Sequence, residues 1–178
     1  PAARTRVLSN DEIRFVMTTS IRPAPVLRFL LLTGLRLGEA YNGHRDGQYW
    51  VVPAKASKNG REHRVWLSSQ ALAQLEAHPW GAPREAVQGW LTDNADGWTA
   101  HDLRRTFSTR NHEMGVPPYV VEKMLNHTFD GMMSVYNHAT YDAERRKALE
   151  AWSAWLSALT DAQPAAVVHI HEAARRTA

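Results

Sequence analysis

Apolar positions change their spacing along the chain, and turn residues separate the segments. A capping box, in which Glu12 follows Ser9 by three residues, predicts a helix that begins at Ser9. The nearly continuous apolar run Pro25–Thr33 predicts a buried helix closed by a left-handed glycine, Gly34. The pattern therefore predicts two helices in the N-terminal part of the chain.

Between Gln48 and Leu67 the spacing becomes that of strands, with Asn59-Gly60 as a tight-turn signal and Pro53 as an interruption. This segment predicts a three-stranded antiparallel sheet. We expect its strands at residues 49–52, 54–58 and 61–67.

The remainder has helical spacing, broken by prolines and glycines. Thr99 with Asp102 forms a second capping signal, and Pro118 suits a first helical turn. The fold class is therefore mainly α with a small three-stranded antiparallel β-sheet. The further helices are expected at residues 69–78, 84–92, 99–114, 118–125, 130–138 and 142–159.

The length of 178 residues fits one domain, which we expect to span residues 1–162. We expect the tail, residues 163–178, to be a docking arm or disordered. A hydrophobic fraction of 44% and a charged fraction of 22% exclude a disordered chain. The chain begins at Pro1 without an initiator methionine, so we expect a fragment of a longer protein.

The chain has no cysteine, which excludes disulfides, a thiol nucleophile and cysteine-bound zinc. No apolar run approaches membrane-spanning length, and we expect a cytoplasmic protein, at the bacterial nucleoid or phage-encoded in its host. The formal charge of +3 is a weak indication of nucleic acid, and a mildly basic enzyme surface gives the same total.

Five short fragments together suit the cleavage of a phosphodiester. Two arginines can hold a phosphate, a lysine can protonate a leaving oxygen, histidines can add hydrogen bonds and a tyrosine can attack phosphorus. Taken alone, each fragment is more simply explained as solvent-exposed surface residues. Arg36 and Glu39, for example, could form an ordinary surface ion pair between residues three apart on a helix. The fragments are Thr33–Glu39, Lys58–Gly60, His101–Arg104, Leu125–His127 and Val135–Tyr136.

Their combination resembles the catalytic domain of the tyrosine recombinases, or phage integrase family, in particular integrases of temperate phages and genomic islands. The similarity rests on the boxes TGLRLGE, HDLRRT and LNH, and on a tyrosine nine residues after His127. It extends from about Arg6 to Leu159, so the resemblance implies that family's catalytic-domain fold for most of the chain.

The resemblance also implies a role for each box. It makes Tyr136 the nucleophile, with Tyr141 as a rival too far from His127, and Lys58 the general acid, with Lys55 as the weaker rival. Glu39 is the implied supporting carboxylate. The catalytic set is then Arg36, Lys58, His101, Arg104, His127 and Tyr136.

Three positions depart from the family pattern without removing a reacting group. Asn126 replaces the usual glycine before His127, and asparagine is the next best residue for a left-handed cap. Trp66 replaces a common proline, and the connection from Glu39 to Gln48 is short.

The implied function is site-specific cleavage and rejoining of double-stranded DNA at attachment sites through a 3′-phosphotyrosine intermediate, with neither metal nor cofactor. The resemblance implies that active relatives work as homotetramers on DNA, with accessory DNA-bending or excision factors and an N-terminal DNA-binding region, which we expect to be absent from this chain. The alternatives are a catalytically silent DNA-binding relative and a resolvase or a type IB topoisomerase. His169 and His171 suggest a histidine-liganded metallohydrolase as a further alternative, but the sequence lacks the ligand spacing that is usual in such enzymes.

Overall fold

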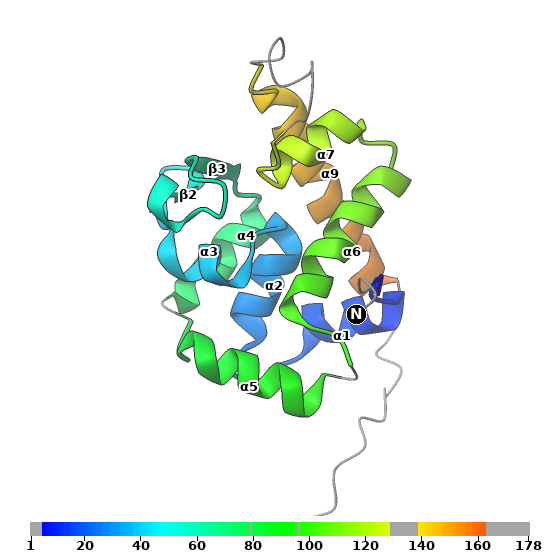
Figure 1. The fold of residues 1–178 in the computed structure, drawn as a ribbon. Coiled ribbons are helices and arrows are strands. Elements are labelled where there is room, and N and C mark those ends of the chain that lie inside the picture. The colour runs from blue at the N-terminus through cyan, green and yellow to red at the C-terminus, as the bar shows by residue number, and fades with distance from the viewer. Residues whose placement is uncertain (1–4, 79, 96, 129–138, 163–178) are drawn as a thin grey trace, which may run out of the picture.

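The computed structural model describes residues 5–78, 80–95, 97–128 and 139–162. The helices form the body of the domain, and the small sheet lies at one side of it (Figure 1). The elements are α1 (Asn10–Thr18), α2 (Ala24–Thr33), α3 (Leu37–Asn42), β1 (His44–Asp46), β2 (Tyr49–Val52), η1 (Ala54–Ala56), β3 (His63–Trp66), α4 (Ser69–Gln74), η2 (Leu75–Ala77), α5 (Arg84–Asn94), α6 (Ala100–Glu113), α7 (Pro118–Met124) and α9 (Asp142–Asp161).

Both expected N-terminal helices are present, and their boundaries have the predicted chemistry. Ser9 caps α1 in a complete capping box with Glu12. Gly34 ends α2 at φ 69°, in the left-handed region. A Cβ at Gly34 would lie 2.6 Å from the Phe107 ring, so α6 approaches α2 too closely there for any side chain. Gly34 therefore sets both the end of α2 and its packing against α6.

The sheet has three antiparallel strands as expected, but one of the predicted strand assignments is wrong. The segment 54–58 forms the short turn η1, because Pro53 removes a ladder donor and Ala56 closes back on the Pro53 carbonyl at 2.8 Å. The third strand is instead β1, in the short connection before Gln48, and the strand order is β1-β2-β3. Helix α3 was also not predicted, since six residues carry little periodicity.

The later helices follow the predicted segments closely. Thr99 caps α6 with Asp102, and Pro118 stands in the first turn of α7. The expected helix at 130–138 and the tail 163–178 lie outside the described residues. Within the described residues, no helix is both long and apolar enough to span a bilayer.

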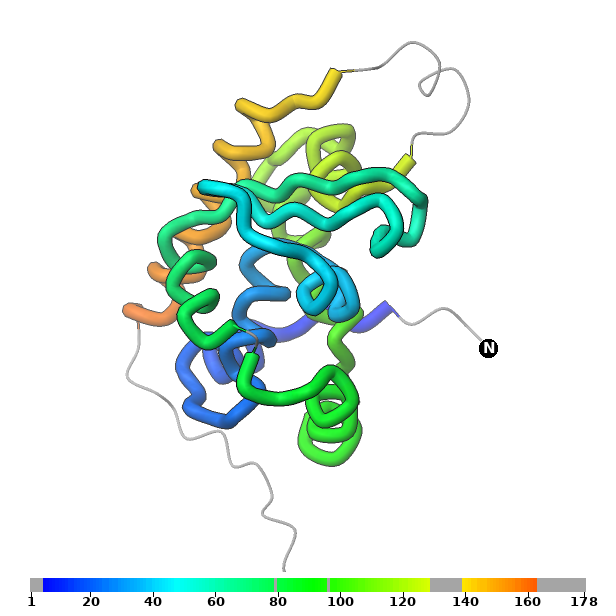
Figure 2. Tube along the Cα trace, turned by 90° about the vertical axis from the view of Figure 1, so that its left-hand side faces the viewer, coloured from blue at the N-terminus to red at the C-terminus, as the bar shows by residue number. Residues whose placement is uncertain are grey.

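The core is one cluster of apolar side chains centred on α2, which packs against α4, α6 and α9. Buried indoles satisfy polar backbone groups in it: Trp50 donates to the carbonyl of Glu39 at 3.1 Å, and Trp152 donates to that of Leu31 at 2.9 Å. The connection between β2 and β3 reaches across to the end of α7 (Figure 2). The fold thus brings four separate segments together at one edge of the core.

Candidate active site

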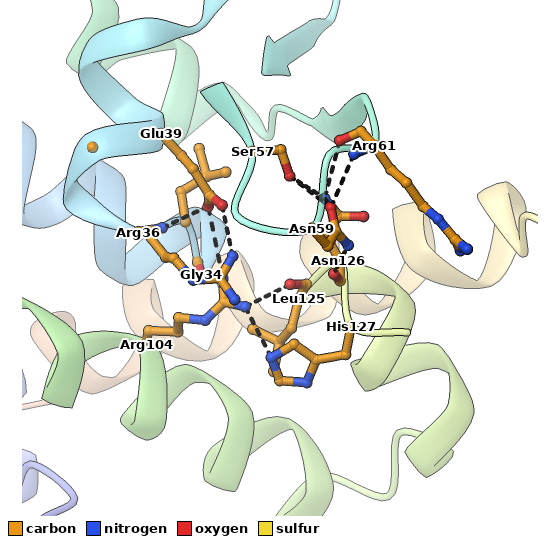
Figure 3. Close-up of polar contacts among 12 residues, drawn as sticks. Gly34, Arg36, Glu39, Ser57, Asn59, Arg61, Arg104, Leu125, Asn126 and His127 are labelled. Carbon is orange, nitrogen blue, oxygen red and sulfur yellow. Dashed lines mark hydrogen bonds and ion pairs between the residues drawn. The ribbon is translucent and has the colours of Figure 1, made fainter. Parts of the chain in front are cut away.

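Arg104, on α6, is the most enclosed cation of the site, with a side chain only 4% exposed. Its Nη1 donates to the Gly34 carbonyl at 2.7 Å, and its Nη2 donates to the Leu125 carbonyl (Figure 3). The Glu39 carboxylate lies 3.9 Å from Nη1. Burial, and secondly the charge of Arg36, lower the pKa of Arg104 to about 10, so it stays a cation at neutral pH.

Arg36 lies at the N-cap of α3, and Glu39 lies in the first turn of that helix. The Glu39 carboxylate accepts from the Arg36 backbone N–H at 2.9 Å and from its Nη1 at 2.6 Å. Glu39 is 2% exposed, whereas the Arg36 side chain is 27% exposed. Because the buried Glu39 joins Arg36 to Arg104, this is no ordinary surface ion pair. In the described part of the chain, Arg36 Nη2 has no hydrogen-bond partner and is available to an anion.

His127 follows α7, and its ring is held at both nitrogens. Nδ1 lies 2.7 Å from Glu122 Oε2, and Nε2 lies 3.1 Å from Arg104 Nη2. A carboxylate can only accept and a guanidinium can only donate, so these partners assign the proton to Nδ1. Sequence reasoning missed Glu122; its position one helical turn before the LNH box was the available signal.

His101 lies on the surface of the first turn of α6, three residues before Arg104. Partial burial lowers its pKa, and the charges of Arg105 and Arg104 lower it further, against the opposing charge of Asp102. His101 is therefore neutral near pH 7 and able to accept a proton.

Lys58 lies in the connection between β2 and β3, and its side chain is exposed. No other described residue forms an ion pair or hydrogen bond with its ammonium group. The rival, Lys55, is exposed in η1. What the structure adds is that the two neighbours of Lys58, Ser57 and Asn59, are anchored to the turn that carries His127.

The anchor is Asn126, the residue that stands where the family has glycine. It is left-handed at φ 54°, as its cap position predicted. Its Nδ2 donates to Ser57 Oγ at 3.0 Å and to Asn59 Oδ1 at 3.2 Å, while its carbonyl accepts from Asn59 Nδ2 at 2.6 Å. In Figure 3 the loop residues lie on one side of this turn, and Arg104 and the His127 ring on the other.

His63 is a further residue of the site that sequence reasoning missed. It is 2% exposed on β3, and neither ring nitrogen forms a well-aligned hydrogen bond in the described part of the chain. The Met124 backbone lies close enough to favour the protonated ring, but only as the weakest influence on its pKa. Burial first, and then the charges of Arg145, Arg104 and Arg36, lower its pKa to about 3. His63 and Val65 alternate with other residues on β3, and this alternation could have predicted that the His63 side chain faces the core.

Tyr136, the expected nucleophile, lies outside the described residues, so its role stays a prediction. The rival Tyr141 is left-handed at φ 53° before α9, and its ring packs on Tyr119 at 4.8 Å between centroids. Trp66, the second departure from the family pattern, donates to Glu150 of α9 at 2.7 Å and lies under Arg146 at 4.1 Å. The tryptophan therefore docks α9 on the sheet.

The structure brings four of the seven expected residues into direct contact, namely Arg36, Glu39, Arg104 and His127. It ties the Lys58 loop to the same turn through Asn126. Among the described residues, no three His, Asp or Glu side chains converge on a common point where a metal ion could bind.

Comparison with known proteins identifies relatives of this chain. Residues 79–143 match the model of the phage integrase family, a range that contains His101, Arg104, His127 and Tyr136. The prophage integrase IntA of Escherichia coli strain K12 is 31% identical, in a match that covers 69% of this chain and 36% of that protein. The chain thus spans about a third of the length of this curated relative.

A solved structure has the same fold. An integrase from the mycobacterium phage Brujita superposes with a TM-score of 0.61 at 19% identity, over 84% of this chain and 58% of that one. The Tn1549 transposon integrase, solved with circular intermediate DNA, gives a TM-score of 0.49 at 15% identity, over 82% of this chain and 65% of that one. The match to the Brujita integrase confirms the mainly helical fold with a three-stranded sheet as that of integrase catalytic domains.

Proposed function

We propose, since this chain carries a catalytic domain of the phage integrase family, that it cleaves and rejoins DNA strands at specific sites. The reaction passes through a covalent 3′-phosphotyrosine intermediate and uses no metal ion. The residues that act are Arg36, Lys58, His101, Arg104, His127 and Tyr136, with Glu39 in support.

One observation carries this proposal: the guanidinium of Arg104 contacts groups from two other segments that the sequence motifs single out. It meets the Gly34 carbonyl and the Glu39 carboxylate of the first motif and the His127 ring of the fourth, although these two motifs are far apart in the chain. Two arginines on one buried carboxylate form a preorganised cationic site, which suits the charge that grows on phosphorus as it becomes five-coordinate.

The nucleophile needs assistance, because a tyrosine hydroxyl has a pKa of about 10 and reacts poorly at neutral pH. On the proposed mechanism, the Tyr136 oxygen attacks phosphorus and its proton passes to His101. The lowered pKa of His101 supports this assignment, since only a neutral imidazole can accept the proton. The arginines would hold the non-bridging oxygens meanwhile.

The leaving group is the 5′ oxygen of the broken strand. As the bond from phosphorus to this oxygen breaks, Lys58 gives it a proton and a 5′ hydroxyl departs. The new bond joins the 3′ phosphate to tyrosine, and a 5′ hydroxyl of another strand can reverse the step without ATP.

The partners follow from the same proposal. We expect double-stranded DNA at attachment sites, a homotetramer on DNA, accessory DNA-bending or excision factors and a cytoplasmic location. The DNA-binding region of the longer relatives would lie outside this chain, whose own domain we set at residues 1–162. DNA binding by this chain alone should then be weak and strongly dependent on salt.

The test is a nicked suicide substrate from which the cleaved 5′ end diffuses away, with the protein–DNA adduct measured by denaturing gel. Wild type and Tyr141→Phe should form the adduct, and Tyr136→Phe should not. Adduct formation should continue in EDTA. A wild type that binds the substrate without forming an adduct would establish a catalytically silent DNA-binding domain, and loss of cleavage in EDTA would indicate a metallohydrolase.

A further inference from the structure

The loop between β2 and β3 is attached to the site by a small polar network that the family's glycine could not form. Asn126 Nδ2 lies within 3.0 Å of Ser57 Oγ and 3.2 Å of Asn59 Oδ1, and reaches the Arg61 carbonyl at 3.5 Å. Glycine in the same place would keep the turn and lose all three contacts.

The orientation of both amides follows from backbone groups. Asn59 Nδ2 faces the Asn126 carbonyl at 2.6 Å, and its Oδ1 faces the Arg61 N–H at 3.1 Å. The Asn59 amide is therefore fixed, and Asn126 must present its Nδ2 to Asn59 Oδ1. Ser57 completes the network by donating to Asn59 Oδ1 at 2.8 Å.

Two residues of the network, Ser57 and Asn59, are the immediate sequence neighbours of Lys58. Ser57 is buried and Asn59 is half-buried, whereas Lys58 is exposed and has no partner among the described residues. The position of the Lys58 backbone relative to His127 and Arg104 thus depends on Asn126, whose next residue is His127 itself.

We propose that Asn126 is a positioning residue for Lys58: it holds the loop against the His127 turn, so that the ammonium group is available to the leaving oxygen. This inference rests on the proposed function and adds to it a residue outside the catalytic set. A displacement of about 1 Å in a reacting group can cost about a hundredfold in rate. We therefore expect Asn126→Gly to slow cleavage by about 10- to 100-fold.

The test compares two suicide substrates, one natural and one with sulfur in place of the bridging 5′ oxygen. A thiol has a pKa of about 8.5 and leaves as thiolate without a proton donor, so the sulfur substrate bypasses Lys58. Asn126→Gly should be slow on the natural substrate and within about threefold of wild type on the sulfur substrate. The reference is Lys58→Ala, which should show the same selective rescue.

Three further variants complete the design. Asn94→Gly makes the same change at the exposed end of α5, on a helix that supplies no site residue, and should match wild type on both substrates. Lys58→Ala with Asn126→Gly should be no slower than Lys58→Ala alone. Asn59→Ala removes the network from the loop side, and it replaces Asn126→Gly as the test if that variant does not fold.

The outcomes separate the two proposals. Equal slowing of Asn126→Gly on both substrates would overturn the positioning role, because Asn126 would then act on the phosphate or the nucleophile. Wild-type rates on both would overturn it as well. A wild type that forms no adduct on either substrate would overturn the proposed function itself, and this inference with it.

Discussion

The surroundings of Arg104 and the loop that carries Lys58 are built in opposite ways. Arg104 is 4% exposed and is held by groups from α2, α3 and the turn after α7. Lys58 is exposed, and only its two neighbours are tied down, through Asn126. One cation is part of the core, and the other stands on a connection outside it.

The difference matches the two tasks of the proposed reaction. A cation that stabilises developing charge is most effective when it is fixed before the substrate arrives. A proton donor must instead reach an oxygen on a bulky double helix, which a buried group cannot do. Mutations should therefore separate the two regions: changes at Arg104 should affect folding and cleavage together, and changes in the loop should affect cleavage alone.

The largest effect is expected from Arg104→Ala. It leaves the Gly34 and Leu125 carbonyls without their donor and removes one of the two cations beside the buried Glu39, which should cost about 3–5 kcal/mol in the free energy of unfolding. Cleavage should fall by about 10²- to 10³-fold or more. Urea unfolding and the covalent-adduct assay measure the two.

Arg36→Ala is the matched control for that experiment. Its side chain is 27% exposed and Glu39 keeps Arg104, so the loss of stability should be much smaller while the loss of cleavage is similar. Equal destabilisation by the two substitutions would contradict the contrast between an enclosed and an open arginine.

Lys58→Ala should change only the chemistry. The side chain is exposed, so the free energy of unfolding should stay within about 0.5 kcal/mol of wild type. Loss of a general acid should slow cleavage by about 10²-fold or more. Lys55→Ala is the control, and a greater loss of cleavage from Lys55→Ala would transfer the acid role to that residue.

The sequence was sufficient where local chemistry decides the structure. The capping boxes of α1 and α6, the left-handed Gly34 and the left-handed Asn126 all follow from residue types that favour these conformations. The sheet was harder, because strand pairing depends on contacts between distant residues. The exposed β1 has no apolar alternation to reveal it.

In the site, the resemblance of the motifs to those of the integrase family predicted that Arg36, Glu39, Arg104 and His127 belong together. It could not predict what supports them. The Asn126 side chain was expected to cap a turn, and its contact with the loop depends on how far the hairpin bends back. His63 was not predicted as part of the site, since its burial beside three arginines exists only in the folded chain.

His63 makes the stability of the enclosed region dependent on pH. Its pKa is about 3 when folded and about 6.5 when unfolded, so below pH 6.5 the unfolded chain takes up a proton that the folded chain does not. The contribution of neutral His63 to the free energy of unfolding is complete above pH 6.5 and is lost as the pH falls below that value. Between pH 6.5 and 5 this should remove about 2 kcal/mol, measured by urea unfolding.

Glutamine does not titrate, so between pH 6.5 and 5 the free energy of unfolding of His63→Gln should fall by about 2 kcal/mol less than that of wild type. The comparison with wild type removes the contributions of His78 and His101, whose pKa values burial also lowers. Parallel curves for the two proteins would mean that His63 is protonated in the folded chain.

The smallest effect is expected at the base of the hairpin, where Trp66 docks α9. Trp66→Ala removes the hydrogen bond to Glu150 and the contact with Arg146, together about 1–2 kcal/mol. Trp66→Phe retains a ring under Arg146 and should lose less. Because Asn126 holds the tip of the loop, the ratio of cleavage rates on the sulfur and natural substrates should stay at the wild-type value in Trp66→Ala. A ratio that rises toward that of Lys58→Ala would mean that the base of the hairpin, and not Asn126 alone, positions the lysine.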